Sequence, residues 1–471
     1  MRLLRTLPDP GQTVPIFGSL PADDHCAEPA ALPWRWQRAA AHGPLHNAAL
    51  AANPDPEARA YQQALDALAR RPDEPVALSL TLPFCAAQCL ICDRTILAAQ
   101  PTRVIDDYVD GLVTQIEAVA GRIGHGRELL QLHLGGGTVN ELSECQLARL
   151  MCSLRAAVRL PDDAETTVEC DPRRSSRLQL SLLRGLGLRH IEFGVLDLDP
   201  QVQRAICRLH SVELIDDVCR LARDCGFELV DLGLMIGLPR QTEASWRATI
   251  EQVIEIAPDR ITLSHYRHWP HFAPAQHAID PLSLPDQAAC QAQAALTVEL
   301  LCGAGYLWLG NDQFVLEDDP LARAQAESQL RRNLISYTAT PPTQMLGLGA
   351  GAVSEIDGHL FWNHAGVRPW LEAVQEGRWA ISHAQPASPR ESRRRAALEH
   401  LFCRLELPAA LARDGLEDLY ESLSAHQESG LVRVDDDRIV MTDSGRHAMT
   451  RLCPHLDRPS RQAEAAHPGL A

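Results

Sequence analysis

The sequence contains no lysine: all of its 44 basic residues are arginines, set against 61 aspartates and glutamates. The absence of lysine excludes Schiff-base chemistry through a lysine amine, and it excludes the phosphate loop of P-loop NTPases, which needs that residue. The formal net charge is −17. A nucleic-acid-binding surface is therefore not expected, although a local basic pocket for an acidic ligand is compatible with this charge.

Long apolar runs are also missing, so no membrane span is expected. The amino-terminal residues MRLLRTLPDPGQ reach Pro8 and Asp9 before a signal-peptide core can develop. Hydrophobic content of 45% with 22% charged residues is ordinary for a globular protein. We therefore predict a cytoplasmic protein without a membrane or nucleic-acid partner.

The 14 cysteines show one pattern, in the segment Leu78–Arg94 (LSLTLPFCAAQCLICDR). Alternating leucines predict a strand that ends at Pro83, because proline cannot donate to a strand ladder. Cys85, Cys89 and Cys92 follow in a C-x3-C-x2-C spacing. Three thiolates on one short loop can each bind one iron of a [4Fe–4S] cluster, which leaves the fourth iron open for a non-protein ligand. An open iron that is chelated by S-adenosylmethionine (SAM) is typical of radical SAM enzymes.

The three cysteines allow two other interpretations. Free cysteines are often buried as small hydrophobic residues. A structural zinc site requires four ligands in paired spacings, and this loop offers three. The position after a strand, in a chain too large to need disulfide staples, favours the cluster.

The chain from 76 to about 310 alternates predicted strands and helices. Repeated βα units imply a parallel sheet, here long enough to curl into a full or partial barrel. The predicted strands after the cysteine loop are Leu129–Leu134, Glu165–Cys170, His190–Val195, Leu229–Ile236 and Arg260–Tyr266. The predicted helices are Val104–Val119, one from about Ser143, Leu178–Leu186, Pro200–Cys207, Val212–Cys225 and Glu243–Ile256.

The flanking parts have a different character. Residues 1–75 are predicted as an amino-terminal arm with one helix near Glu57–Arg71. From about Asp312 the βα rhythm is lost, and we assign 311–457 to a carboxy-terminal helical, winged-helix-like module. It contains helices at Ser392–Arg404 and Gly415–Ser424, followed by a hairpin of Leu431–Val434 and Ile439–Thr442. Residues 458–471 are predicted as a flexible tail.

Candidate ligand-binding residues fall at predicted strand ends, where parallel barrels collect their chemistry. The run Gly135–Gly137 offers amides to a ligand, although turns use glycine as well. Glu169 ends the strand in VECDP and is able to accept hydrogen bonds from a ribose or an ammonium, but an ordinary solvated acid fits equally well. Arg208 suits a carboxylate, with a surface arginine as the simpler interpretation. The aromatic and histidine side chains of SHYRHWPHF (residues 264–272) are expected to gather around a large planar substrate.

Taken together and in order, six motifs resemble those of oxygen-independent coproporphyrinogen III oxidases. They are LPFCAAQCLIC, LHLGGGT, VECDP, GLPRQT, PDRITLSHY and RNLISYT, and they span the chain from about Val76 to the terminal hairpin. The first two are shared with related radical SAM proteins, whereas RNxxxYT (Arg332, Asn333, Tyr337 and Thr338) is more particular to the oxidases than to their haem-binding chaperone relatives. The resemblance implies a curved, partial radical SAM barrel with a carboxy-terminal helical module, which agrees with the α/β pattern.

The resemblance also implies a reaction and its cofactors. Two propionates of coproporphyrinogen III are decarboxylated oxidatively to vinyls, giving protoporphyrinogen IX, with one [4Fe–4S] cluster and two SAM molecules. By the resemblance, Cys85, Cys89 and Cys92 bind the cluster. The SAM sites then include Gly136, Gly137, Thr138, Glu169, Arg208, Val353 and Ile91, the last touching the second SAM. The resemblance further implies a tetrapyrrole substrate, a reducing donor such as flavodoxin or ferredoxin, and a monomeric chain.

Several positions depart from the family pattern. Before the cysteine loop, Ser79 and Thr81 replace a tyrosine and a histidine, and within the loop Arg94 replaces a cysteine that does not bind the cluster. At the second SAM site, Leu196 replaces a glutamine and Gly233 replaces an aspartate. Further along, Gln313 replaces a histidine, while Asp312 remains. The amino-terminal family element survives only as PIFGSLP, residues 15–21. Because two polar groups are lost at the second SAM site, we expect one tightly bound SAM and a second that is weak or absent. A radical SAM enzyme acting on another tetrapyrrole such as haem, and a haem-binding chaperone, remain alternatives.

Overall fold

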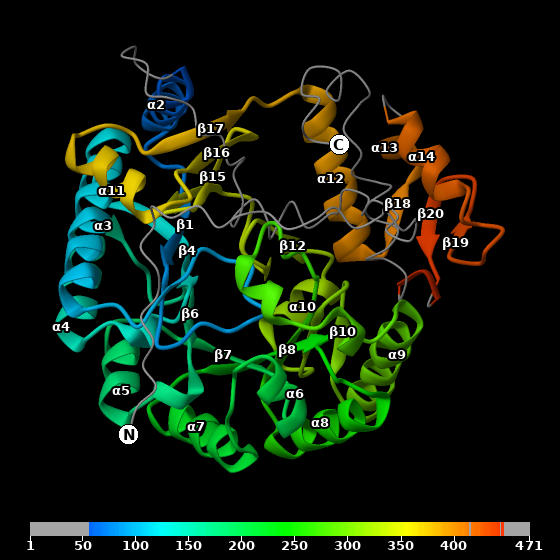
Figure 1. The fold of residues 1–471 in the computed structure, drawn as a ribbon. Helices are drawn as coiled ribbons and strands as arrows, with labels where there is room; N and C mark the ends of the chain where they lie inside the picture. The colour runs from blue at the N-terminus through cyan, green and yellow to red at the C-terminus, as the bar shows by residue number, and fades with distance from the viewer. Residues whose placement is uncertain (1–55, 414–415, 443, 447–471) are drawn as a thin grey trace, which may run out of the picture. The chain divides into compact units, whose positions relative to one another are not determined.

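The computed structural model describes residues 56–413, 416–442 and 444–446. Its main element is a sheet of 13 strands, and Figure 1 shows helices α3, α4, α5, α7 and α8 on the outer side of this sheet. The strand order is β10-β11-β9-β8-β7-β6-β4-β1-β14-β15-β16-β17, and β5 pairs with β4. Its two ends, β10 and β17, are not paired with each other. The fold is thus the predicted α/β partial barrel.

The barrel strands run parallel from β1 to β9. They are β1 (Val76–Leu82), β4 (Arg127–Gly136), β6 (Glu165–Cys170), β7 (His190–Leu196), β8 (Leu229–Ile236) and β9 (Arg260–His265), with the short β5 (Val158–Arg159). The connecting helices are α3 (Thr102–Ile123), α4 (Glu144–Ala157), α5 (Arg177–Gly185), α6 (Pro200–Ala205), α7 (Val212–Asp224), α8 (Glu243–Ile256) and α9 (Gln287–Gly303). Capping boxes at Ser143 and Thr242 mark where α4 and α8 begin. The predicted βα rhythm is confirmed.

Alternation along the strands separates an apolar outer face from a polar inner one. In β6, Thr166, Val168 and Cys170 are buried, whereas Glu165, Thr167 and Glu169 are partly exposed. The outward residues join one large core with the helices. Successive side chains of a strand point to opposite faces. The inward positions of the barrel strands therefore line a space, called here the lumen, with polar groups.

The sheet continues beyond residue 310, which corrects the expected division at 310/311. Strand β14 (Gln344–Leu348) pairs parallel with β1, and β15 (Val353–Ile356), β16 (His359–Asn363) and β17 (Ile381–Gln385) extend the sheet from there. On the opposite edge β10 (Leu307–Leu309) and β11 (Gln313–Val315) pair antiparallel and extend β9. Helices α10 (Pro320–Ala326) and α11 (Val367–Gln375) belong to these extensions.

The described part of the predicted amino-terminal arm is helix α2 (Pro56–Ala69). Its buried Tyr61 packs against Phe361 and Trp379, with ring centroids 5.2 and 5.5 Å away. Arg127 ties this region to the barrel, because its guanidinium donates to the carbonyls of Arg71 and Glu74 at 2.7 Å. The element at residues 15–21, the rest of the arm before Pro56 and the tail 458–471 lie outside the described residues.

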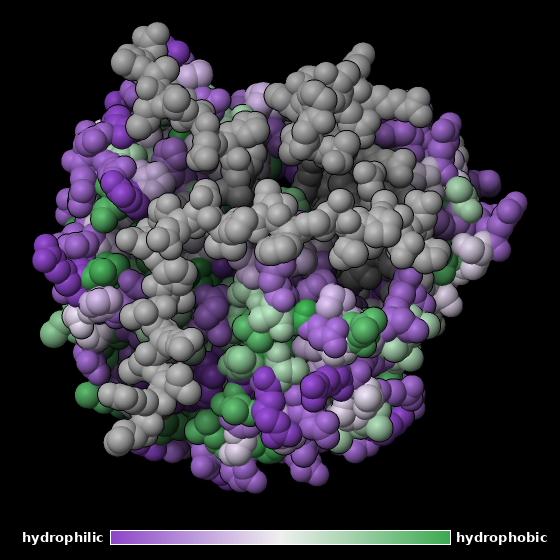
Figure 2. Space-filling view, in the orientation of Figure 1, coloured by the Kyte–Doolittle hydropathy of each residue, from purple (hydrophilic) through white to green (hydrophobic). Residues whose placement is uncertain are grey.

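The carboxy-terminal helices and hairpin form a small unit with its own apolar core. It contains α12 (Pro389–Arg404), α13 (Ala409–Arg413) and α14 (Glu417–Ser424), and the sheet β18-β20-β19 of Glu406–Pro408, Arg438–Met441 and Val432–Val434. The predicted helix–helix–hairpin order is confirmed. On the face shown in Figure 2, hydrophilic residues cover most of the periphery. Among the described helices, none combines the length and apolarity that a membrane crossing requires.

Candidate functional site

The cysteine loop is closed by a short parallel pairing directly after β1. Strand β2 (Phe84–Cys85) pairs with β3 (Leu97–Ala98). The amide of Leu97 donates to the carbonyl of Pro83 at 2.7 Å, and the amide of Ala99 donates to that of Cys85 at 2.9 Å. The proline predicted to end the first strand thus also accepts the bond that closes the loop.

Two further bonds attach the loop to the barrel. The amide of Leu90 donates to the carbonyl of Ile206 after α6 at 3.1 Å. The buried Gln276 donates from Nε2 to the carbonyl of Ile91 at 3.1 Å. Because both partners are backbone atoms of the loop, its position is set without using the cysteine side chains.

The three thiols are sheltered and close enough to influence one another. Cys85, Cys89 and Cys92 are free and partly buried. Burial raises the pKa of Cys85, and the neighbouring Cys89 adds to that rise. Burial raises the pKa of Cys92 to about 12, with a further contribution from Cys85. The Arg208 Nη1 lies 3.6 Å from the Cys89 Sγ. Sheltered, adjacent thiols beside a guanidinium suit a multi-iron cluster whose irons replace the protons.

A single metal ion is not indicated. Within the described ranges no three or more His, Cys, Asp or Glu side chains converge as the ligands of one ion. A cubane spreads its thiolates over separate iron atoms, so the two observations agree.

The glycine run packs β4 against the cysteine loop. The amide of Gly137 donates to the carbonyl of Leu82 at 2.7 Å, and the amide of Thr138 donates to that of Phe84 at 2.8 Å. A Cβ on Gly137 would lie 2.3 Å from the Phe84 carbonyl oxygen, so only glycine fits there. The amide of Gly137, one of those expected to face a ligand, is therefore already bonded. The carbonyl of Gly136, in contrast, faces the site and accepts from Arg94 Nη1 at 3.1 Å.

Glu169 is the best-defined polar group at the strand ends. Its Oε2 lies 2.9 Å from Arg94 Nη1, and its Oε1 lies 3.2 Å from His133 Nε2. A Cβ on Gly135 would lie 2.4 Å from Oε1, so that glycine makes room for the carboxylate. Burial opposes ionisation, but Arg94 and His133 outweigh it and lower the pKa of Glu169 to about 2. Glu169 is thus an ionised carboxylate that Arg94 and His133 hold in place at the mouth of the lumen.

Arg208 is buried rather than on the surface. Its side chain is 8% exposed, and its Nε donates to the carbonyl of Gly194 in β7 at 2.9 Å. The carboxylate of Asp171 lies 3.9 Å away, and Asp171 is held mainly by Arg173. Arg208 therefore links β7 to the cysteine loop.

The two apolar candidates lie in different clusters. Ile91 packs with Val202, Ile206, Leu238 and Ile279, next to Leu196 and Met235. Val353, on β15, is buried in another cluster with Ala77, Leu334, Met345 and Trp362. The structure thus brings the cysteines, Gly136 to Thr138, Glu169, Arg208 and Ile91 to one end of the barrel, while Val353 packs in the separate cluster with Ala77 and Leu334.

The RNLISYT segment closes the lumen at the amino-terminal ends of two strands. Asn333 Nδ2 donates to Gln131 Oε1 on β4 at 2.6 Å. Thr338 Oγ1 and the Ala339 amide donate to the carboxylate of Glu165 on β6 at 2.6 and 2.9 Å. Gln131 and Glu165 are register partners in the sheet. The segment therefore supplies a floor opposite the cysteine loop.

Two acids in the lumen, Glu192 and Asp231, were not among the predicted site residues. Glu192 on β7 is in register with Glu169 on one side and with Asp231 on the other. The only sequence signal for them is the alternation of side chains along a strand. Glu192 alternates with the buried Ile191, Phe193 and Val195, so it faces the opposite side, toward the lumen.

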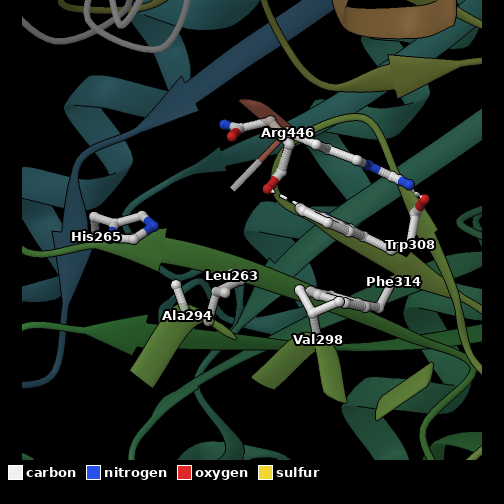
Figure 3. A pocket seen from close by; sticks show the side chains of 8 residues that line it. Leu263, His265, Ala294, Val298, Trp308, Phe314 and Arg446 are labelled. Carbon is white, nitrogen blue, oxygen red and sulfur yellow. Dashed lines mark hydrogen bonds between the residues drawn. The ribbon is translucent and has the colours of Figure 1, made fainter. Parts of the chain in front are cut away.

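The SHYRHWPHF residues do not gather around one point, which corrects the expectation. Tyr266 Oη is 2.9 Å from His268 Nδ1, whereas His271 stacks edge-on with His277. His265 turns to a separate small pocket between β9, α9 and the β10–β11 hairpin, where Figure 3 shows it with Trp308 and Arg446. That pocket is not lined by any of the cysteines or strand-end residues described above.

Comparison with known proteins gives consistent matches. The radical SAM superfamily model matches residues 79–253. An oxygen-independent coproporphyrinogen III oxidase of Pseudomonas aeruginosa is 32% identical over 83% of this chain and 87% of its own length. The corresponding Escherichia coli K12 protein is 33% identical over 85% of this chain and 89% of its own length. The solved structure of the E. coli enzyme, described as a radical SAM enzyme, superposes with a TM-score of 0.79 at 31% identity, covering 85% of this chain and 93% of that one.

Proposed function

This chain belongs to the oxygen-independent coproporphyrinogen III oxidases of the radical SAM superfamily, and we propose that it decarboxylates coproporphyrinogen III to protoporphyrinogen IX in haem biosynthesis. The observation that carries this function is the placement of the three-cysteine loop and the anionic Glu169 at one end of a polar lumen closed at the other end by RNLISYT. A parallel barrel collects its reactive groups at the carboxyl ends of the strands, and radical chemistry needs a site sheltered from water and side reactions.

Cys85, Cys89 and Cys92 would hold the [4Fe–4S] cluster, and SAM would bind beside it at Gly136 and Glu169. The chemistry supplied by the reduced cluster with SAM is removal of a hydrogen atom from a propionate β-carbon, after which carbon dioxide leaves and an electron passes to an external acceptor.

This chain's own residues position the reactants. The carbonyl of Gly136 and the carboxylate of Glu169 are hydrogen-bond acceptors, and together they suit the ammonium or ribose donors of SAM. His133 and Gly135 hold the carboxylate in place from the side of β4. Arg208, between Gly194 and Cys89, keeps the loop against β7 and places positive charge beside a thiolate.

We propose that a second SAM binds weakly or not at all. Leu196 and Gly233 offer no side-chain hydrogen bond at the mouth of the lumen, and Leu196 packs with the apolar cluster around Ile91. An unpaired polar ligand group in a closed site costs about 1–3 kcal/mol, so two such losses weaken binding by about two or three powers of ten. By the resemblance, Val353 is proposed as an apolar wall of a SAM site; it packs with Ala77 of β1 and Leu334 of the RNLISYT segment.

The proposed partners are a flavodoxin or ferredoxin as the reductant and the tetrapyrrole itself, and the proposed state is a cytoplasmic monomer. Cluster reduction requires a low-potential one-electron donor, because ferredoxin-like potentials near about −400 mV match those of such clusters.

The test is an anaerobic reaction of the cluster-loaded, reduced protein with SAM and coproporphyrinogen III, with products resolved by mass. The expected result is the sequential loss of two carbon dioxide equivalents. Cleavage of SAM with an unchanged tetrapyrrole mass would contradict the proposal, and turnover of haem under the same conditions would support the alternative substrate.

A further inference from the structure

Three carboxyl groups lie side by side on adjacent strands in the lumen. Glu169 on β6 is in register with Glu192 on β7, and Glu192 is in register with Asp231 on β8. Like charges directly opposite on neighbouring strands destabilise a sheet. An arrangement that costs stability and lines an active-site space is a candidate for function.

The first of the three is paired with cationic side chains, whereas no residue that the structure describes forms an ion pair with the other two. Arg94 and Arg260 partly offset the raised pKa values of Glu192 and Asp231, respectively. Glu169 is paired with Arg94 and His133. Asp231 accepts through Oδ2 from Thr262 at 2.8 Å and from Gln313 at 3.3 Å, while its Oδ1 is buried without a hydrogen-bond partner. Glu192 has no hydrogen bond from any residue that the structure describes.

The carboxyl of Glu192 has its own space next to Gly233. A Cβ at that glycine would lie 3.2 Å from Glu192 Oε1, which is tighter than ordinary contact, so a side chain there would push the carboxyl aside. Glu192 therefore has room beside Gly233, and on the neighbouring strand Asp231 holds one buried acceptor oxygen without a hydrogen-bond partner.

The protonation behaviour of Glu192 and Asp231 indicates which kind of hydrogen-bond donor the pair suits. Burial and the neighbouring Asp231 raise the pKa of Glu192 well above its ordinary value, and burial raises that of Asp231. The free oxygens of such a pair accept hydrogen bonds from neutral N–H donors. A porphyrinogen carries four pyrrole N–H groups that can turn toward one face, whereas a metalloporphyrin carries none.

We propose that Glu192 and Asp231 hold the substrate through its pyrrole N–H groups and so select the reduced, metal-free macrocycle. The inference rests on the proposed function, since it needs a porphyrinogen in the lumen. With the macrocycle centre over this pair, the reacting propionate extends toward the cysteine loop.

The test compares anaerobic binding of coproporphyrinogen III and zinc coproporphyrin III, which share their propionates but differ in N–H groups. The proteins are the cluster-loaded wild type, Glu192→Gln, Glu192→Gln/Asp231→Asn, and the control Glu228→Gln, which alters an exposed acid paired with Arg184 and Arg189. The wild type and the control are expected to prefer the porphyrinogen. The double variant should bind it about tenfold more weakly or worse, with zinc coproporphyrin and SAM affinities unchanged.

Two results would overturn the inference: equal loss for both macrocycles, or loss confined to SAM, which would assign the acids to that ligand. Its failure is distinguishable from failure of the proposed function. If the wild type forms protoporphyrinogen IX while the double variant keeps its preference for the porphyrinogen, only the inference fails. If the wild type neither binds nor converts coproporphyrinogen III, both fail.

Discussion

The guanidinium of Arg94 and the carboxylate of Glu169 form an ion pair of 2.9 Å between the cysteine loop and β6. Arg94 also donates to the carbonyl of Gly136, so one side chain connects the loop, β4 and β6. The relationship joins the two parts that the proposed chemistry must keep in register, the cysteine loop proposed to bind the cluster and the strand ends proposed to bind SAM.

Replacing Glu169 should affect ligand binding more than folding. Glu169→Gln removes the carboxylate that is proposed to accept from SAM, and charge-assisted bonds of this kind are worth about 1.5–3 kcal/mol. SAM affinity of the cluster-loaded protein should fall by about tenfold or more, whereas the thermal midpoint should fall moderately because Arg94 and His133 lose their anionic partner. Unchanged SAM binding, measured by equilibrium dialysis, would remove Glu169 from the SAM site.

Loss of one cysteine of the loop should abolish the cluster. Cys89→Ala leaves two thiolates for a site that needs three, so iron content after anaerobic reconstitution should fall from about four per chain, together with the visible absorbance and SAM cleavage. Cys145→Ala, at an exposed position on α4, is the matched control and should retain all three. An equal requirement for Cys145 would show that the ligand assignment is wrong.

The acids of the lumen should make stability depend on pH. Because the pKa of Glu192 is raised in the folded protein by burial, Asp231 and Glu169, its contribution to stability is present below the ordinary glutamate pKa of about 4.3 and is lost as the pH rises through the folded value. Glu192→Gln should therefore reduce the decrease in thermal midpoint from about pH 5 to about pH 8. An identical decrease in wild type and variant would contradict the raised pKa.

The floor of the lumen depends on a second ion pair. Arg332 donates to both oxygens of Asp312 at 2.8 and 2.9 Å, and its guanidinium lies 4.4 Å from the Tyr337 ring centroid. Arg332→Met would leave the buried Asp312 unpaired, and such losses cost about 3–5 kcal/mol of unfolding free energy. Denaturant unfolding measures this. Arg368→Met, at an exposed i,i+4 pair on α11, is the control and should change stability by less than about 0.5 kcal/mol.

The barrel could be predicted because the hydrophobic pattern of each segment agrees with the strand or helix that the segment forms in the fold. Strands Glu165–Cys170 and Leu229–Ile236 and helix Glu243–Ile256 begin and end where the sequence predicts. Strands β14 to β17 were missed because they are short, and because β14, which joins them to the barrel, pairs with β1 from far along the chain. Pairing at such separation leaves no periodic signal in a local window.

The candidate site was predictable where a motif carries the chemistry, as in the cysteine loop. It was not predictable where function depends on side chains meeting across strands. Glu192 and Asp231 are single acids in apolar strands, and only the register of β7 with β8 brings them together. The bonds of Gly137 and Thr138 to the chain before the cysteines were equally hidden, because they depend on how closely β4 approaches β1.

The most direct test of the proposed reaction follows one hydrogen atom. Cluster-loaded, reduced protein would be given SAM and coproporphyrinogen III deuterated at the propionate β-carbons, and the 5′-deoxyadenosine released would be analysed by mass. The account predicts one deuterium in the deoxyadenosine for each vinyl group formed. Deoxyadenosine without deuterium, released while the propionates stay intact, would contradict it.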